Sequence, residues 1–243
     1  MSFPQTIMGK YGWEKVTTSA QKHKLGTRMQ IFDREFVYVQ AGEAITAGVL
    51  VDGMAGTAAH QVDLAVNAAS AGDTTVTLSG SLTITLNQYK DGWLIFNDVE
   101  EEGHMYRVKS NTAVSSATGC VITLDEEDGL ATAITTSQQV GLYENPHKEV
   151  EIHDFNDIDN APLGWACVDI ADTYYGWICD KGFTTALIDG TPGIGAQLVV
   201  SQGVDGAIEV LDSDADDEGT VVAVMGPIAG VAGEYGLVKA NIG

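Results

Sequence analysis

Basic residues are scarce in this chain, and their scarcity excludes several kinds of partner. Twelve Lys and Arg stand against 34 Asp and Glu, which gives a formal net charge of −22 over 243 residues. A protein that binds nucleic acid without regard to sequence needs clustered Lys and Arg to neutralise phosphates. An anionic membrane surface would repel so acidic a chain. We therefore expect neither nucleic acid nor a membrane as a partner.

Cysteine and long apolar runs are scarce as well. Cys120, Cys167 and Cys179 contain no Cys-x-x-Cys pair, and three cysteines cannot all be bridged. Each lies in an apolar run, so we expect small buried thiols and a reducing compartment. The longest apolar run, residues 221–233, is too short and too broken by Gly and Pro to span a bilayer. The first residues show no secretory signal pattern.

The chain also lacks the 3.6-residue apolar stripe of an amphipathic helix in any segment of a dozen residues. Short alternating runs separated by Gly, Asp and Asn take its place. We predict an all-β protein with at most one short helix. A main β domain, a small barrel or sandwich, is assembled from residues 34–60 and 146–243. Residues 61–145 form an inserted second β domain, and residues 1–33 form an extended N-terminal arm.

The stretch Tyr174–Val200 is the expected centre of the main domain. Its first six residues place apolar side chains on both faces by the two-residue period, which predicts a strand buried on both sides. Asp180-Lys181-Gly182 predicts a tight turn at the end of that strand. Two further strands are predicted near the N-terminus, at Phe36–Val39 and Val49–Val51.

The predicted inserted domain has its own pattern of half-buried antiparallel strands. Apolar residues alternate with Thr and other residues at 75–78, 82–86 and 120–124. An apolar run, an acidic turn and a returning strand predict a hairpin across Asn97–Gly103. About 85 residues suffice for a modest independent core.

Positive charge is concentrated at the N-terminus. Residues 1–34 carry a net charge of +4, which leaves −26 for the rest of the chain. The six basic residues are Lys10, Lys15, Lys22, Lys24, Arg28 and Arg34. An arm of opposite sign to the body suits docking to an acidic neighbour, including another copy of the same chain. A solvated, partly disordered tail is the alternative.

Two acidic segments are candidates for metal sites. Asp212–Glu218 opens like a calcium loop but has Asp217 at the sixth place, which needs Gly, and Ala223 at the twelfth, which needs Glu. We therefore expect a solvated loop. The segment HKEVEIH places its two His and two Glu on one face of a strand, and an edge strand with its polar face in water explains the same pattern. The segment holds His147, Glu149, Glu151 and His153.

The sequence contains no pattern typical of catalysis. The glycines of GTPGIG precede no GK[ST], and neither GxSxG nor HExxH occurs. The carboxylates at 100–102 and 125–128 lie in predicted turns, where like charges are usually solvated. We expect no enzymatic activity, no cofactor and no metal.

Several stretches resemble structural proteins of tailed bacteriophages. The block YKDGWLIFNDVEEEGHMYRVKS at 89–110, followed by CVITLDEEDGLATAI, is similar to a segment of such proteins, especially marine ones. The stretch LGWACVDIADTYYGWICDKGFTTALIDGTPGIGAQLVV, then VDGAIEVLDS and TVVAVMGPIAGVAGEYGLVKANIG, resembles capsid decoration (cement) proteins. VQAGEAITAGVLV fits the same pattern. The resemblance covers most of residues 34–243 and does not include the arm.

This resemblance implies an all-β virion protein that binds and stabilises the outer surface of an icosahedral head, often as a trimer at local three-fold positions. Its partners would be the major capsid protein and further copies of itself, and it would be made in the host cytoplasm. We hypothesise that the six basic residues contact the shell or a neighbouring subunit, a role inferred from charge alone.

Three other functions stay open at this point. A major capsid subunit would need a long spine helix, which the pattern does not predict. A tail, fibre or spike component could bind carbohydrate through Trp13, Trp93, Trp165 or Trp177, although two of these lie in strongly apolar strands. An enzyme acting on polysaccharide would rest on scattered carboxylates.

Overall fold

A computed structural model describes residues 6–99, 101–156, 160–211 and 220–242. In these ranges the regular structure is strand, apart from two short 3₁₀ helices, η1 (Trp13–Lys15) and η2 (Ala58–His60). The all-β prediction is confirmed. None of the described helices has the length and apolar character needed to cross a membrane. The chain divides into two compact units: unit 1 is Met1–Met54 with His147–Gly243, and unit 2 is Ala55–Pro146.

Unit 1 is built on one long strand, β15 (Tyr175–Ile188). The second half of β15 belongs to a closed five-stranded barrel, in which each strand is hydrogen-bonded to the next and β19 returns to β15. The other barrel strands, in spatial order, are β17 (Ala207–Val210), β16 (Gln197–Val200), β18 (Ala223–Met225) and β19 (Tyr235–Asn241). Apolar side chains such as Leu198, Ile208 and Val238 fill the barrel.

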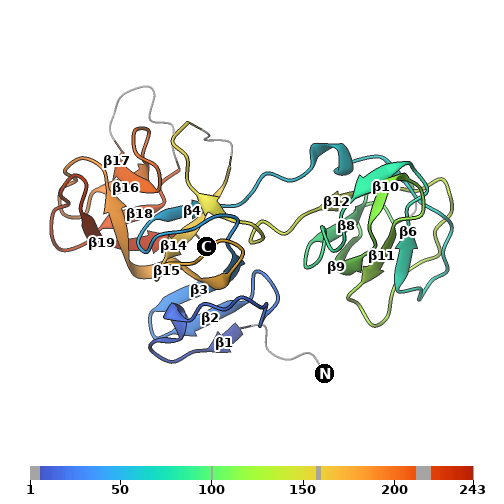
Figure 1. Cartoon of the computed structure of the whole chain (residues 1–243), viewed down its shortest axis with the longest axis horizontal. Helices are drawn as coiled ribbons and strands as arrows, with labels where there is room; N and C mark the ends of the chain where they lie inside the picture. The colour runs from blue at the N-terminus through green and yellow to red at the C-terminus, as the bar shows by residue number, and fades with distance from the viewer. Residues whose placement is uncertain (1–5, 100, 157–159, 212–219, 243) are drawn as a thin grey trace. The chain divides into compact units, whose positions relative to one another are not determined.

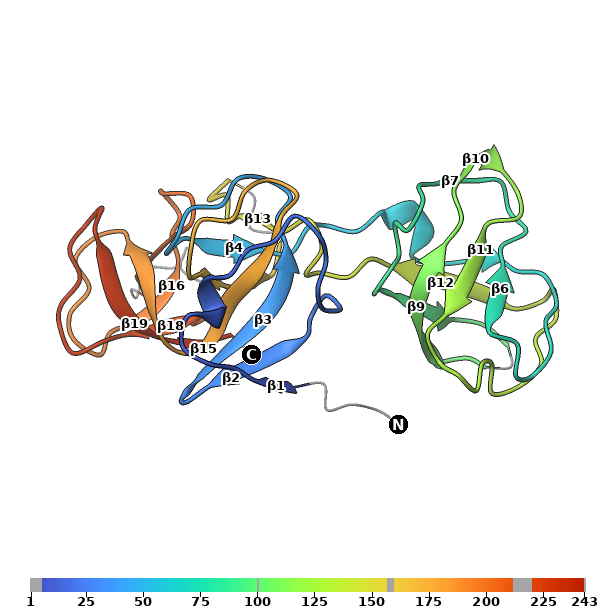
Figure 2. The same ribbon diagram turned by 60° about the horizontal axis from the view of Figure 1, so that its bottom comes forward.

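The first half of β15 belongs to a curled sheet (Figures 1 and 2). On one edge it pairs with β3 (Arg34–Gln40), which leads to β2 (Arg28–Ile31) and β1 (Thr6–Met8). On the other edge it pairs with β14 (Pro162–Ala166), which leads to β4 (Leu50–Asp52) and β13 (Glu151–Ile152). Residues 176–180 are buried, as predicted for a strand covered on both faces.

The predicted turn at Asp180-Lys181-Gly182 is wrong. The strand continues through these residues, and its pairing with β3 shifts register between Cys179 and Lys181. The physical reason is that a β-bulge uses the same residue types as a turn. Gly182 has φ +93°, and a Cβ there would lie 2.5 Å from the carbonyl oxygen of Asp33. Pairing continues beyond the bulge because β19 pairs with β15 from Lys181 onward, on the edge opposite β3.

The described part of residues 1–33 is not a free arm. β2 forms an antiparallel hairpin with β3, β1 adds to β2 in parallel, and Thr18 bridges Tyr175. Leu25 and Met29 are buried. The alternation Arg-Met-Gln-Ile in β2 supplies the two-residue period that places its apolar side chains in the core. These residues therefore form part of the unit 1 sheet, in place of the expected extended arm.

Unit 2 comes from one continuous segment. Its main sheet has the order β5 (Leu64–Ala65), β12 (Gln139–Tyr143), β8 (Trp93–Phe96), β9 (Met105–Asn111), β11 (Val121–Leu124) and β6 (Thr75–Thr77). A second, two-stranded sheet joins β7 (Leu82–Ile84) and β10 (Val114–Ala117). β8 and β9 form the predicted hairpin, and the predicted strands at 75–78, 82–86 and 120–124 are present with slightly shorter bounds.

Candidate functional site

The structure separates the six basic residues selected from the sequence. Lys10, Lys15, Lys22 and Lys24 are exposed, and Lys15 lies in η1. Arg28 is held at 2.7 Å from the buried carboxylate of Asp180, so its charge is already paired. Arg34, the first residue of β3, is half-buried. Lys15 and Arg34 line a common cleft.

Exposed apolar side chains interleave with these lysines. Tyr11 and Phe32 are each 71% exposed and stack on one another, with ring centroids 5.0 Å apart. Sequence reasoning missed this cluster, because aromatics without a strand period gave no signal until the β2–β3 hairpin brought Phe32 to Tyr11. We call the set the N-terminal surface, and it consists of Met8, Lys10, Tyr11, Trp13, Lys15, Val16 and Phe32.

A cleft of about 620 Å³ adjoins the N-terminal surface, and Tyr11 and Lys15 belong to both. We call it the arginine cleft, because the Arg34 side chain lies in its wall. Its lining consists of Tyr11, Glu14, Lys15, Arg34, Thr46, Ala47, Gly48, Ala166, Cys167, Thr184, Thr185 and Tyr235. The lining combines residues from both chain segments of unit 1, so it exists only when the segments fold together.

The Arg34 guanidinium has few acceptors. Nη2 lies 3.6 Å from the sulfur of Cys167, and the guanidinium carbon lies 4.7 Å from the centroid of the Phe36 ring. Nε is buried without a hydrogen-bond partner. Within the described ranges, no carboxylate lies at ion-pair distance from Arg34.

The neighbouring groups do not cancel this charge. Burial, the adjacent Cys179 and Glu14 raise the pKa of Cys167 to about 12, although Arg34 acts in the opposite direction. The thiol is therefore neutral at ordinary pH. Glu14 is 4% exposed, and its Oε2 accepts a hydrogen bond of 2.7 Å from the backbone N–H of Gly12. The other two cysteines, Cys120 and Cys179, are buried free thiols.

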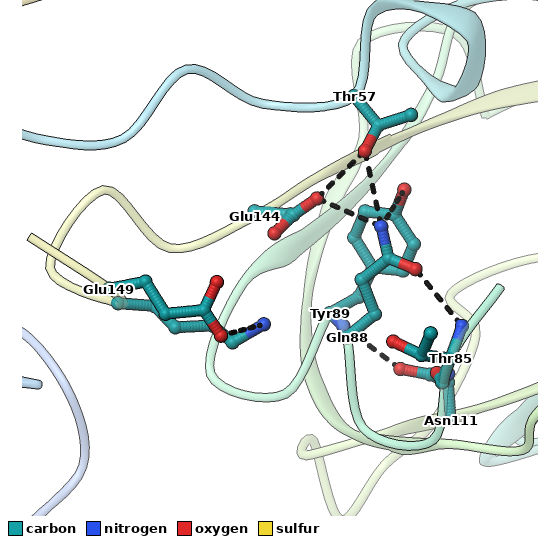
Figure 3. Close-up of polar contacts among 8 residues, drawn as sticks. Thr57, Thr85, Gln88, Tyr89, Asn111, Glu144 and Glu149 are labelled. Carbon is teal, nitrogen blue, oxygen red and sulfur yellow. Dashed lines mark hydrogen bonds and ion pairs between the residues drawn. The ribbon is translucent and has the colours of Figure 1, made fainter. Parts of the chain in front are cut away.

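Unit 2 contains a separate polar cluster around Glu144 (Figure 3). Oε1 of Glu144 accepts hydrogen bonds from Thr57 Oγ1 at 3.0 Å and from Gln88 Nε2 at 2.9 Å. The hydroxyl of Tyr89 lies 2.5 Å from Nδ1 of His60. Because Thr57 and Glu144 lie near the two ends of unit 2, these bonds hold its first and last segments together.

The segment weighed as a metal site does not keep its four polar residues on one face. Only Glu151–Ile152 forms a strand, whereas Glu149 has φ +54° and pairs with Lys148 at 3.4 Å. His153 is buried, and its Nδ1 lies 2.6 Å from Oδ2 of Asp52. The predicted strand is therefore much shorter than expected, because the positive φ of Glu149 breaks it. The acidic segment Asp212–Glu218 lies outside the described residues.

The tryptophans considered for carbohydrate binding lie in different environments. Trp165 and Trp177 are in the core of unit 1, at 0% and 5% exposure. Trp93 is half-buried, with the Arg107 guanidinium 4.7 Å above its ring. Trp13, at 44% exposure, is the member of this set that presents a large surface to solvent.

Comparison with known proteins gives no relative: no family model, no curated protein and no solved structure matches this chain. The functional conclusion therefore rests on the geometry of the N-terminal surface and the arginine cleft.

Proposed function

We propose that this chain is a structural protein of a tailed-phage virion, which binds the outer surface of the icosahedral head and stabilises it. Its partners would be the major capsid protein and other copies of itself, with a trimer favoured. The observation that carries the proposal is the N-terminal surface, where exposed aromatics and lysines lie in η1 and in the turns next to β1, β2 and β3. The sequence phrases that resemble decoration proteins add support.

The composition of the N-terminal surface suits a protein interface. Aromatic residues and Met are enriched at the centres of such interfaces, where they supply large apolar areas. Exposed apolar patches with polar neighbours mark sites of association. The Tyr11–Phe32 stack also holds two rings in one arrangement before binding, which reduces the conformational entropy lost on docking.

The charge of the N-terminal surface determines which kind of partner surface it attracts. Residues 1–34 carry +4 in a chain of −22, so an acidic partner surface would be attracted to this part of the molecule and repelled by the rest. A decoration protein is present in many copies on one shell, and symmetric repetition strengthens modest individual contacts. The acidic remainder keeps closely spaced copies soluble.

Co-sedimentation with heads assembled without this protein tests the proposal. We expect saturable binding at a number of copies that matches the symmetry of the shell. Binding should weaken between low and moderate salt, because exposed lysines are screened by ions. Absence of binding to intact heads at low salt would overturn the proposal.

The second candidate is a tail or fibre component that binds carbohydrate. The exposure of Trp13 and Tyr11 favours it, because sugars stack on exposed aromatic rings. Reproducible hits on a glycan array, lost in Trp13→Ala, would support this function. An array without hits would count against it.

A further inference from the structure

The arginine cleft contains a guanidinium that has no carboxylate at ion-pair distance among the described residues. Arg34 has five N–H donors, and its hydrogen-bond partners among the described residues are two thiols, that of Cys167 at 3.6 Å and that of Cys179. Its Nε is buried without an acceptor. A partly buried charge without an ion-pair partner is unfavourable, whereas an anion placed beside it offsets part of that cost. The site therefore favours occupation by an anionic group.

The lining indicates which anion fits. The planar guanidinium matches a carboxylate with two parallel hydrogen bonds. The walls also contain hydroxyl-bearing residues, which are hydrogen-bond donors: Thr46, Thr184, Thr185 and Tyr235. The volume of about 620 Å³ exceeds what one small ion needs and accommodates a side chain with its neighbouring backbone.

Glu14 decides between a carboxylate and a phosphate. Its buried carboxylate lines the same cleft and repels any further negative charge. A phosphate carries close to two charges at neutral pH and is repelled more strongly than a carboxylate, which carries one. Arg34 and Lys15 on the walls compensate one Glu14 carboxylate and one incoming carboxylate, and they leave no further positive charge.

We infer that the arginine cleft binds a carboxylate side chain from an acidic segment of a protein partner, with Arg34 as its anchor. The inference deepens the proposed docking function, because Tyr11 and Lys15 belong to both the cleft and the N-terminal surface. The partner would lay its surface on the exposed aromatics and insert one Asp or Glu beside Arg34.

A peptide titration followed by NMR chemical shifts tests the inference without phage heads. The probe is a Gly-Glu-Gly tripeptide with both ends capped, and the reference is the matching Gly-Gln-Gly peptide. We expect saturable shifts at the cleft residues with the first peptide and none with the second. Inorganic phosphate, titrated separately, should bind more weakly than the Glu peptide.

Variants of the wall residues should change the affinity in opposite directions. Arg34→Gln should weaken peptide binding by about ten-fold or more. Arg34→Lys should weaken it by a smaller factor, because a lysine keeps the charge but cannot donate the two parallel hydrogen bonds of a guanidinium. Glu14→Gln should strengthen it several-fold, since a neutral amide removes the repulsion while its oxygen can still accept from Gly12. Lys22→Gln removes an exposed charge that does not line the cleft and is the matched control.

The outcomes separate this inference from the proposed function. Shifts of equal size with both peptides, unchanged binding in Arg34→Gln, or tighter binding of phosphate would each overturn the carboxylate site. Thermal melts of each variant exclude unfolding as the cause of a loss. Head binding that persists in Arg34→Gln would overturn the inference alone, whereas peptide binding without head binding would overturn the proposed function alone.

Discussion

The two units of the chain differ in how their cores are built. Unit 2 is one continuous segment, and its buried apolar residues form a single cluster in the described part of that segment. Unit 1 joins two distant segments, and its described core divides into three clusters that share β15. Three residues of β15 each belong to a different one of these clusters: Trp177, Ile178 and Ile188.

This difference shows which chain segments each unit needs in order to fold. Contacts in unit 2 can form as soon as Ala55–Pro146 is present, whereas the curled sheet of unit 1 is complete only when β3, from the segment before unit 2, pairs with β15 from the segment after it. The N-terminal surface and the arginine cleft lie on the unit that requires this long-range assembly.

Truncation of a core ring in unit 2 should affect that unit alone. Phe96 is 0% exposed and packs against Tyr106 with ring centroids 6.0 Å apart. We expect Phe96→Ala to lower the free energy of unfolding of unit 2 by about 3–5 kcal/mol. Hydrogen exchange resolved by peptide would measure the loss in each unit.

The control for that change lies on the other unit. Phe183 on β15 is 41% exposed, so Phe183→Ala should cost about 1 kcal/mol or less. Equal loss of protection in both units after Phe96→Ala would contradict the independence of their cores.

The buried carboxylate of Glu101 anchors the hairpin loop of unit 2. It accepts hydrogen bonds from Thr132 N and Oγ1 at 2.5 and 2.7 Å, from Tyr106 Oη at 2.7 Å and from His104 Nδ1 at 2.6 Å. Glu101→Gln should therefore lower the stability of unit 2 by about 2–3 kcal/mol, because an amide replaces an acceptor with a donor. The exposed neighbour Glu102 offers the matched variant Glu102→Gln, for which denaturant unfolding should show a change below about 0.5 kcal/mol. Similar losses for both would show that these hydrogen bonds contribute little.

The stability of the two units should depend on pH in opposite directions, through Glu101 in unit 2 and His153 in unit 1. Burial alone would raise the pKa of Glu101, but hydrogen bonds from Thr132, Tyr106 and His104 outweigh it and hold the pKa below 4.5. Its contribution is present above that value and is lost as the pH falls through the lowered pKa. In unit 1 the hydrogen bond to Asp52 raises the pKa of His153 above 6.5, although burial opposes the shift. That contribution is complete below 6.5 and is lost as the pH rises through the raised pKa.

Stability measured against pH for wild type and His153→Gln tests the second half of this prediction. The difference in stability between wild type and His153→Gln should shrink as the pH rises from about 6 to 9. Hydrogen exchange resolved by peptide should locate this change in the peptides that contain β4 and β13. A stability advantage of wild type that grows over this pH range would show that the predicted direction of the pKa shift of His153 is wrong.

Much of the fold could be predicted from the sequence, because the two-residue period is a local signal. It located β3, β4 and most strands of unit 2, and it identified β15 as buried on both faces. The local sequence signal gave a wrong prediction at Gly182, where it indicated a turn. A β-bulge and a turn need the same residue types, and only long-range pairing decides between them. The local signal also missed the role of residues 28–31, where a four-residue strand is too short to stand out.

The candidate site was only partly visible. Charge identified Lys15 and Arg34, but it also selected Arg28, which a buried Asp180 far along the chain neutralises. The Tyr11–Phe32 stack and the partners of Arg34 depend on which strands pair, and no local pattern encodes that. Glu101 likewise appeared to be one of several turn carboxylates, although its hydrogen bonds distinguish it from its exposed neighbour.

Head binding by two matched double variants tests whether the N-terminal surface docks on the shell. One is Trp13→Ala with Lys15→Gln on the N-terminal surface of unit 1. The other is Met105→Ala with Lys109→Gln on β9 of unit 2, which also removes one exposed apolar side chain and one exposed charge. Copies bound per head, counted by co-sedimentation below saturation, should fall about ten-fold for the first and stay at the wild-type level for the second. Unchanged binding by the first variant, or equal losses in both, would contradict the account.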